Sequence, residues 1–401
     1  MSFSERLTNH LAERKNNQLL RSRKILSSGQ AHTVHLQNRP ETLLNFCSND
    51  YLGLAQHPEI ISSFQKAAAL YGVGSGASHL VIGHHLEHHL LEQELAEFLN
   101  VERTLVFGSG YAANLGVLTT LLEKSDAVFQ DKLNHASLLD GGLFSGALFQ
   151  RYLHKDMHSL EKKLAKASIN TVNIKDTQQK LIVSDAVFSM DGDSADIGGL
   201  LALSKKYQAW LMLDDAHGFG VLGKEGRGSV SQQNIAQKEI DIYMATFGKA
   251  LGCGGAFVAG SDLLIESLIQ FSRHYIYTTA MPPALAAAIR TALKIVKQEQ
   301  WRRDHLQKLI KQFREGAQAI NLNLLDSSTA IQPVILGSAQ SALAWSEALL
   351  KKDILISAIR PPTVPANSSR LRITFSAAHG EDQVNRLLDA LAEIKKHSVA
   401  E

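Results

Sequence analysis

The 401-residue sequence has only two cysteines, Cys47 and Cys253, which are too few for a framework of disulfide bonds. It has no apolar run approaching the roughly 18 residues that indicate a transmembrane helix. Residues 1–17 are charged and amphipathic, so they lack the apolar core of a signal peptide. These absences predict a cytoplasmic protein with no membrane partner.

The sequence also has little excess of either charge, because 41 Lys and Arg residues nearly balance 39 Asp and Glu residues. A formal net charge of +2 gives no reason to expect nucleic acid as a partner. The composition, 45% hydrophobic and 20% charged, is typical of globular proteins. The length is sufficient for two or three domains with a sizeable core.

Short apolar runs alternate with helix-period segments from about residue 49 to residue 285. This alternation predicts an α/β fold with a mainly parallel central sheet that is flanked by helices. In such sheets, ligands bind beyond the carboxyl ends of the strands. The predicted strands cover residues 104–107, 127–130, 180–186, 210–214, 242–246 and 256–260.

The chain is predicted to divide into three segments. These are an N-terminal helix and arm (1–48), a large domain (49–285) and a small α+β C-terminal domain (286–401). The N-terminal helix should extend to about residue 22. A proline pair, Pro282-Pro283, marks the second boundary and precedes a predicted helix over about 284–320. The order strand, helix, strand, strand, helix is expected from about Ile331 onward.

A lysine follows the predicted strand 242–246, in the glycine-rich stretch Gly248-Lys249-Ala250-Leu251-Gly252. Glycines allow the backbone to approach a ligand closely, and a lysine with a lowered pKa can form a Schiff base. Taken alone, this stretch favours the other interpretation, a surface lysine in a flexible loop. The order of residues in a phosphate-binding Walker loop is absent.

The apolar strand 210–214 ends in Asp214-Asp215-Ala216-His217. A carboxylate at the end of a buried strand is costly unless it meets a partner, such as the protonated pyridine nitrogen of a cofactor. Because side chains alternate along a strand, Asp214 and Asp215 should point in different directions. His217 could reach an oxygen on the same ring. A metal site or a capped turn explains these residues equally well.

Small residues join the predicted strand 104–107 to a helix, in the stretch Ser109-Gly110-Tyr111. Free backbone N–H groups at the start of a helix bind phosphate well. An ordinary strand–helix turn is the other interpretation. A second glycine run, 72–76, has no preceding strand, so no dinucleotide site is expected there.

Three motifs occur in one order: SGYAAN (109–114), DDAHGFG (214–220) and TFGKALG (246–252). Together they resemble the motifs of the α-oxoamine synthases, which are pyridoxal 5′-phosphate (PLP) enzymes of the aspartate-aminotransferase fold, fold type I. The resemblance extends from Asn49 to His379. It implies a homodimeric acyltransferase that joins an amino acid to an acyl thioester.

The resemblance also implies roles for the residues that match the family's motifs. Lys249 would hold PLP as a Schiff base and move the substrate proton, while Asp214 and His217 would contact the pyridine nitrogen and the 3′-oxygen. His135 would stack on the ring, although the residues alone favour a helix cap at this position. Further cofactor contacts are implied for Gly110, Tyr111, Ser189 and Thr246. Substrate contacts are implied for Arg21, His135, Thr363 and Arg372.

Two segments, 271–283 and 358–365, most resemble the family members that act in biotin biosynthesis. Those members condense L-alanine with pimeloyl-CoA or pimeloyl-acyl carrier protein and release CO2. Glycine acylation, as in glycine C-acetyltransferase or 5-aminolevulinate synthase, is the nearest alternative. A non-catalytic scaffold subunit is another, which the joint presence of Lys249, Asp214 and His135 disfavours.

Two histidine pairs with i, i+4 spacing, His84/His88 and His85/His89, lie on a predicted helix. Such spacing can bind zinc. Spacing matches are frequent by chance, and the family needs no metal, so we expect none. A zinc-dependent protein remains an alternative.

Overall fold

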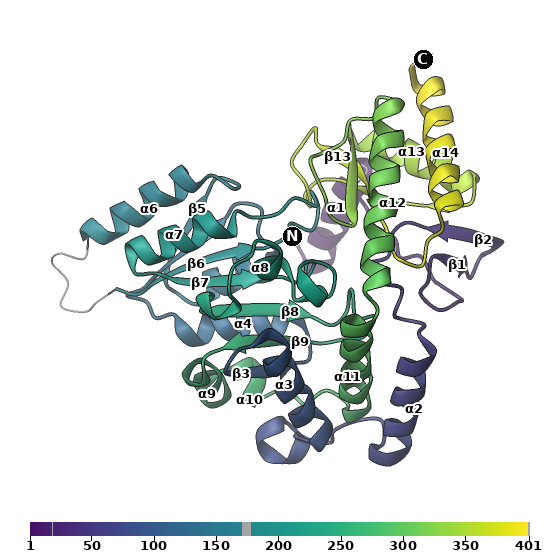
Figure 1. Ribbon diagram of the computed structural model, residues 1–401. Helices are drawn as coiled ribbons and strands as arrows, with labels where there is room; N and C mark the ends of the chain where they lie inside the picture. Colours follow the sequence, from purple (N-terminus) through teal and green to yellow (C-terminus); the bar gives the residue numbers. More distant parts are fainter. Residues whose placement is uncertain (18, 171–177, 400–401) are drawn as a thin grey trace. The chain divides into compact units, whose positions relative to one another are not determined.

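The computed structural model describes residues 1–17, 19–170 and 178–399 of the chain (Figure 1). The chain forms two compact units. Unit 1 consists of residues 1–53, 190–193 and 304–401, and unit 2 of residues 54–189 and 194–303. The three segments expected from the sequence, with boundaries at residues 48 and 285, stay a prediction.

The centre of unit 2 is a seven-stranded sheet with the strand order β3-β9-β8-β7-β6-β4-β5. Strand β9 is antiparallel to both of its neighbours, whereas β8, β7, β6, β4 and β5 are parallel. The predicted mainly parallel α/β sheet is therefore confirmed. The strands are β3 (Arg103–Phe107), β4 (Ala127–Asp131), β5 (Leu148–Tyr152), β6 (Lys180–Asp185), β7 (Trp210–Asp214), β8 (Ile242–Thr246) and β9 (Ala256–Gly260).

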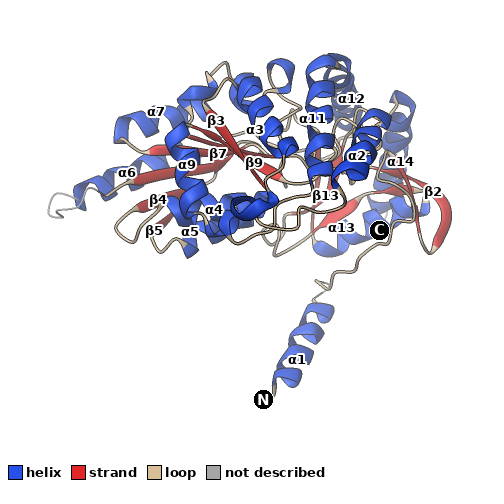
Figure 2. Cartoon of the chain, turned by 90° about the horizontal axis from the view of Figure 1, so that it is seen from below, coloured by secondary structure: helices blue, strands red, loops and turns tan. Residues whose placement is uncertain are grey.

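Helices cover both faces of this sheet, as Figure 2 shows for α4 and α5 on one side and α3 and α7 on the other. Leu105 and Phe107 of β3 share a buried apolar cluster with Val117 of α4. Thr104 faces the opposite side, where its hydroxyl donates to the Glu92 carbonyl of α3 at 2.8 Å. The period-2 alternation of side chains along each strand thus builds two apolar layers.

The helices of unit 2 are α2 (Pro58–Tyr71), α3 (Leu86–Leu99), α4 (Gly110–Leu121), α5 (Ala136–Phe144), α6 (Met157–Asn170), α7 (Ile197–Tyr207), α8 (Ser229–Gln232), α9 (Asp262–Phe271), α10 (Arg273–Ile276) and α11 (Pro283–Gln298). A π-helical turn, η1 (His79–Gly83), precedes α3, and two 3₁₀ turns are η3 (Lys224–Gly226) and η4 (Gln237–Glu239). Helix α12 (Gln300–Ala319) begins in unit 2 and continues into unit 1.

Unit 1 contains two three-stranded sheets, with the orders β1-β2-β11 and β10-β13-β12. Its strands are β1 (Thr33–Leu36), β2 (Arg39–Asn45), β10 (Ile331–Gly337), β11 (Ile354–Leu355), β12 (Ser357–Ile359) and β13 (Ser369–Thr374). Its other helices are α1 (Phe3–Asn16), α13 (Ala339–Lys351) and α14 (Glu381–Val399). The C-terminal part has one short strand more than the sequence predicted.

Three predicted helices have different bounds in the structure. The helix expected over 284–320 is interrupted at Glu299, whose ψ of 65° is not helical. The N-terminal helix ends at Asn16 rather than near residue 22. Helix α3 begins only at Leu86, so His84 and His85 precede it. No helix within the described residues is long and apolar enough to cross a bilayer.

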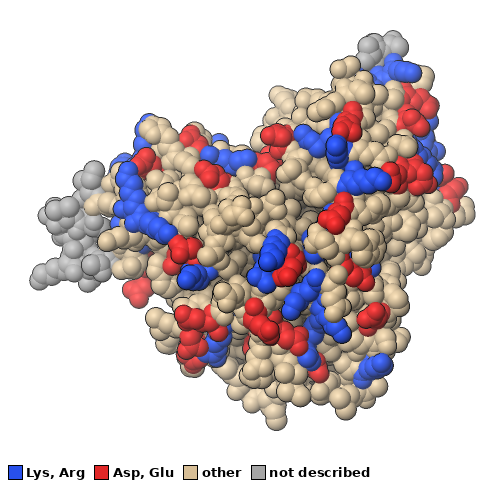
Figure 3. Space-filling view, in the orientation of Figure 1, with Lys and Arg blue, Asp and Glu red and all other residues tan. Residues whose placement is uncertain are grey.

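Acidic and basic side chains are interspersed on the face of the molecule drawn in Figure 3. This distribution agrees with the small net charge of the sequence, +2.

Candidate active site

The residues that follow the carboxyl ends of five strands meet in one cavity of unit 2, with a volume of ≈ 190 Å³. Gly110 follows β3, His135 follows β4, Ser189 follows β6, His217 follows β7 and Lys249 follows β8. These strands point in one direction, so their carboxyl ends lie at the same edge of the sheet, where ligands bind in α/β folds.

All the predicted cofactor-binding residues line this cavity, namely Lys249, Gly110, Tyr111, His135, Ser189, Asp214, His217 and Thr246. The cavity also contains residues for which no role was predicted, namely Asn114, Ser137, Asp185, Ala216 and Met244. Asn114 belongs to the first motif and Asp185 ends a buried strand, as Asp214 does. Each of those two features is a signal that could have identified them.

Asp214 is 4% exposed, and its carboxylate accepts two hydrogen bonds. Asn114 Nδ2 donates to Oδ2 at 2.7 Å, and the Ala216 N–H donates to Oδ1 at 3.0 Å. Such donors stabilise the charged form of a buried carboxylate. Asp215 points elsewhere, toward Ser229 and Tyr243, so the predicted divergence of the two aspartates is confirmed.

A second carboxyl group, that of Asp185, lies beside Asp214, because the two residues are partners in the register of β6 and β7. Burial raises the pKa of Asp185 well above its usual value, and the neighbouring charge of Asp214 adds to this effect. Both effects favour the protonated form of Asp185. Asp185 Oδ2 also accepts the backbone N–H of His135 at 2.6 Å.

His135 is the N-cap residue of α5, where its Nδ1 accepts the Ser137 N–H at 3.3 Å. The helix cap that the residues alone favoured is therefore confirmed. Loss of hydration at the cavity wall lowers the pKa of His135, while the charge of Asp214 opposes this and that of Lys249 adds to it. The ring lies edge-to-face with that of Tyr111, with centroids 6.5 Å apart.

Lys249 is held in a closed loop between β8 and β9. The Lys249 carbonyl accepts the Gly252 N–H at 3.0 Å, and the Cys253 N–H donates to the Phe247 carbonyl at 2.9 Å. Gly252 has a φ of +65°, and a Cβ there would lie 2.3 Å from the Ala55 nitrogen. Only glycine fits this position, so the glycine-rich sequence fixes the half-buried lysine at the cavity.

The cavity offers polar groups and space that suit PLP. Within the described part of the chain, Thr246 Oγ1 and Asn114 Oδ1 are buried without a hydrogen-bond partner. Gly110 begins α4, and a Cβ at this residue would lie 2.7 Å from Thr246 Cγ2. Glycine therefore lets Thr246 pack close to the N-terminus of α4, and a helix N-terminus favours a phosphate group.

The other predicted substrate residues belong to unit 1. Arg21 donates to Thr363 Oγ1 at 2.7 Å. Arg372 lies on β13 and donates through both terminal nitrogens to Asn49 Oδ1, each at 3.2 Å. Arg372 is 7% exposed, so its guanidinium group is held inside the unit.

The family model for class I and II aminotransferases matches residues 41–391. The chain therefore belongs to this family and, within it, to the α-oxoamine synthases, the PLP enzymes of fold type I that its three motifs resemble. It is an enzyme, and PLP is its cofactor.

Individual relatives refine this assignment. A curated 8-amino-7-oxononanoate synthase from Cellvibrio japonicus (strain Ueda107) is 56% identical over 384 residues, which cover 96% of this chain and 94% of the relative. A solved structure of SPT with PLP has a TM-score of 0.92 and 26% identity, and the match covers 99% of each chain. The 8-amino-7-oxononanoate synthase of Francisella tularensis has a TM-score of 0.76 and 31% identity, covering 89% of this chain and 99% of that one.

Proposed function

We propose that this chain condenses L-alanine with a pimeloyl thioester, giving 8-amino-7-oxononanoate, CO2 and a free thiol, as a step of biotin biosynthesis. The observation that carries the proposal is the 56% identity, over 96% of the chain, with a relative named 8-amino-7-oxononanoate synthase. The segments 271–283 and 358–365, which resemble that branch of the family, also support it.

Lys249 is assigned two tasks in this proposal. Its amine would attach PLP covalently, and once the amine of alanine has displaced it, the freed amine would take the proton from the alanine Cα. When bound, PLP accepts the electron pair that this carbon releases on losing a proton and again on losing CO2. The hydrogen bonds that close the loop around Lys249 support both tasks, because proton transfer requires an amine at a fixed position.

Asp214 is assigned as the partner of the pyridine nitrogen. Its carboxylate keeps a proton on that nitrogen, and the donors from Asn114 and Ala216 orient both of its oxygens. Burial and the neighbouring Asp214 raise the pKa of Asp185, so Asp185 is the weaker competitor for this role, which supports the assignment.

The remaining cofactor contacts are assigned by their place in the cavity and their match to the family's motifs. His217 bonds the 3′-oxygen, Gly110 and Tyr111 hold the phosphate at the start of α4, and Ser189 and Thr246 supply hydroxyl groups. The lowered pKa of His135 favours a neutral ring, which suits stacking on an aromatic cofactor and orienting the amino acid.

Substrate contacts are proposed for Arg372, Arg21, Thr363 and His135. A guanidinium group can grip the alanine carboxylate with two parallel hydrogen bonds, and both terminal nitrogens of Arg372 already donate to a single oxygen, Asn49 Oδ1. The pairing of Arg21 with Thr363 supports a shared role for these two residues.

A homodimer and a cytoplasmic location also belong to this proposal. The family resemblance supports the dimer, and the two cysteines, neither of them in a disulfide, support a reducing compartment. Light scattering should give about twice the chain mass of 43.9 kDa.

The amino acid and the acyl donor can be identified directly. Alanine, glycine and serine are each titrated into the holoenzyme while the visible spectrum of the cofactor is followed, and products are then identified by mass. We expect alanine to give the largest spectral change, and 8-amino-7-oxononanoate to form from alanine and a pimeloyl thioester. Parallel reactions with the CoA and carrier-protein thioesters establish which donor is used. The proposal would be contradicted if glycine gave the largest spectral change and formed product with acetyl-CoA or succinyl-CoA.

A further inference from the structure

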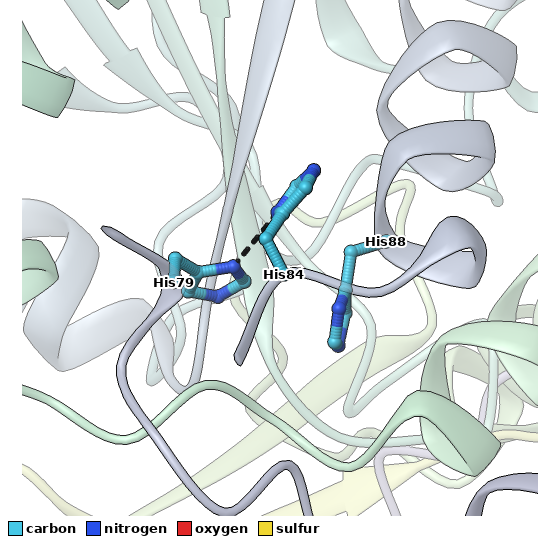
Figure 4. A group of neighbouring side chains, drawn as sticks. All are labelled: His79, His84 and His88. Atoms are coloured by element: carbon cyan, nitrogen blue, oxygen red, sulfur yellow. Dashed lines mark hydrogen bonds between the residues drawn. The ribbon is translucent and has the colours of Figure 1, made fainter. Parts of the chain in front are cut away.

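A group of histidines in unit 2 lies outside the PLP cavity and has no part in the proposed reaction. His79, His84 and His88 each place a ring nitrogen within 4.8 Å of the other two. Figure 4 shows the hydrogen bond that joins the tilted rings of His79 and His84, with the ring of His88 beside them. We propose that these three histidines bind one divalent transition-metal ion of the zinc type.

The backbone brings the histidines together in a way that the predicted helix pairs do not. The turn η1 reverses the chain after His79, and the Gly83 N–H donates to the Ser78 carbonyl at 2.9 Å. A Cβ at Gly83 would lie 2.1 Å from the Ala77 carbonyl oxygen, so this close approach requires glycine. The chain therefore returns His84 to the side of His79 before α3 begins.

The distance between the first two rings is close to that of a metal site. His79 Nδ1 and His84 Nδ1 are 2.9 Å apart. Two nitrogen ligands bound to tetrahedral zinc at about 2.0–2.1 Å lie about 3.3 Å from each other. Moving the two rings a few tenths of an ångström further apart would make room for the ion. The ion would replace the proton that the two nitrogens now share.

Two of the three rings have an oxygen atom near the nitrogen that would not bind the metal. His88 Nε2 is 2.8 Å from the Met281 carbonyl oxygen, so this nitrogen carries the proton and Nδ1 keeps its lone pair. His84 Nε2 lies 4.0 Å from Glu92 Oε2, which is too far for a hydrogen bond. Metal-binding histidines usually donate their other N–H to a carbonyl or a carboxylate, as His88 does to Met281.

Nδ1 of His88 accepts the backbone N–H of His85 at 3.0 Å. Metal binding exchanges this single neutral hydrogen bond for a coordinate bond. Glu92 is fixed in turn by the Val106 N–H of β3, which donates to Oε1 at 3.0 Å. The outer groups are thus anchored to the sheet, while Oε2 of Glu92 remains directed toward His84.

A cavity of ≈ 540 Å³ lined by His79, His84 and Glu92 gives an ion access and leaves room for water as a fourth ligand.

The test uses untagged holoenzyme that has been treated with a chelator and is then titrated with Zn²⁺ alone, with bound metal measured by mass spectrometry. We expect one zinc per chain. His79→Gln and His84→Gln should each weaken binding at least tenfold. Cobalt at the same stoichiometry should give the visible bands of a site with nitrogen ligands.

His89→Gln and His158→Gln are matched controls, because both histidines are exposed and neither belongs to the cluster. Both variants should bind zinc as the unmodified enzyme does. Equal PLP content establishes that each variant is folded. The proposal is overturned by the absence of stoichiometric zinc, by unchanged affinity in His79→Gln and His84→Gln, or by loss of binding in His89→Gln, which would indicate the pair His85/His89 instead.

Discussion

Asn114 Nδ2 donates a hydrogen bond to Asp214 Oδ2 at 2.7 Å, and both residues are almost fully buried. Asn114 lies on α4, the helix that begins at Gly110, while Asp214 ends β7. The same Nδ2 also donates to Ser137 Oγ at 2.9 Å. One helix therefore supplies both the glycine at the proposed phosphate end of the cavity and the amide that orients the carboxylate at the other end.

Asn114→Leu should slow proton removal from alanine without preventing PLP binding. The substitution deletes a buried hydrogen bond to a charged group, which typically contributes about 1.5–3 kcal/mol. Since about 1.4 kcal/mol corresponds to a tenfold change in rate, exchange of the alanine Cα proton should slow at least tenfold. NMR in deuterated buffer without an acyl donor measures this rate. Asn385→Leu, on the exposed face of α14, is the control. Equal exchange rates in all three enzymes would refute the role of Asn114.

Lys249→Ala should abolish turnover and the covalent attachment of PLP. The variant retains the other groups of the cavity, so it can still bind PLP by noncovalent contacts. Borohydride reduction followed by peptide mapping should label residue 249 in the unmodified enzyme and nothing in the variant. Lys238→Ala, an exposed lysine of the same unit, should behave as the unmodified enzyme does. A label on any other lysine contradicts the assignment.

Gly110→Ala should weaken PLP binding, because its Cβ would lie 2.7 Å from Thr246 Cγ2, where one of the two groups must move. The added methyl group occupies space at the start of α4 that the phosphate needs. Gly108→Ala provides a close control, since a Cβ there has no neighbour within 4 Å. We expect at least a tenfold rise in the PLP dissociation constant for Gly110→Ala alone, measured by fluorescence quenching. Similar constants for the two variants would exclude a steric cause.

The sequence predicted the central sheet well because its strands are short, apolar and separated by helix-period segments. It missed β5, whose Leu148 is exposed and whose pattern LFQRY is not clearly apolar or alternating. It also joined α11 to α12, because Glu299 is an ordinary helix residue whose non-helical conformation has no local signal. Tertiary packing decides such features, and single-sequence patterns do not record it.

The cavity residues were predicted to the extent that they lie next to strand ends in recognisable motifs. Lys249, Asp214 and His217 meet this condition. Asp185 was missed although it ends β6, because its importance depends on the strand register that places it beside Asp214. The histidine cluster was missed in a different way: the sequence suggested helix pairs, whereas the turn before α3 brings His79 to His84.

Arg372→Lys should raise the KM for alanine while leaving the KM for the thioester nearly unchanged. Both terminal nitrogens of Arg372 donate to Asn49, and lysine cannot reproduce this planar fork. Loss of one charge-assisted hydrogen bond corresponds to about a tenfold change or more in affinity for the carboxylate. Initial-rate kinetics with each substrate varied in turn separate the two constants. A parallel rise in both KM values would instead indicate a general disturbance of unit 1.

Asp215→Asn should change how thermal stability depends on pH. Burial raises the pKa of Asp215 to about 6, despite hydrogen bonds donated by Ser229 and Tyr243. Between about pH 4 and pH 6 the folded enzyme therefore holds a proton that the unfolded chain has released. The contribution of Asp215 to the free energy of unfolding falls as pH rises through that window. The free energy of unfolding changes by at most about 3 kcal/mol across this window. Asparagine does not titrate, so the variant serves as the reference. The difference in Tm, unmodified enzyme minus variant, should fall from pH 4.5 to pH 6.5 and then level off. A flat difference over the same interval would mean that the donors from Ser229 and Tyr243 outweigh burial, and that Asp215 is charged throughout.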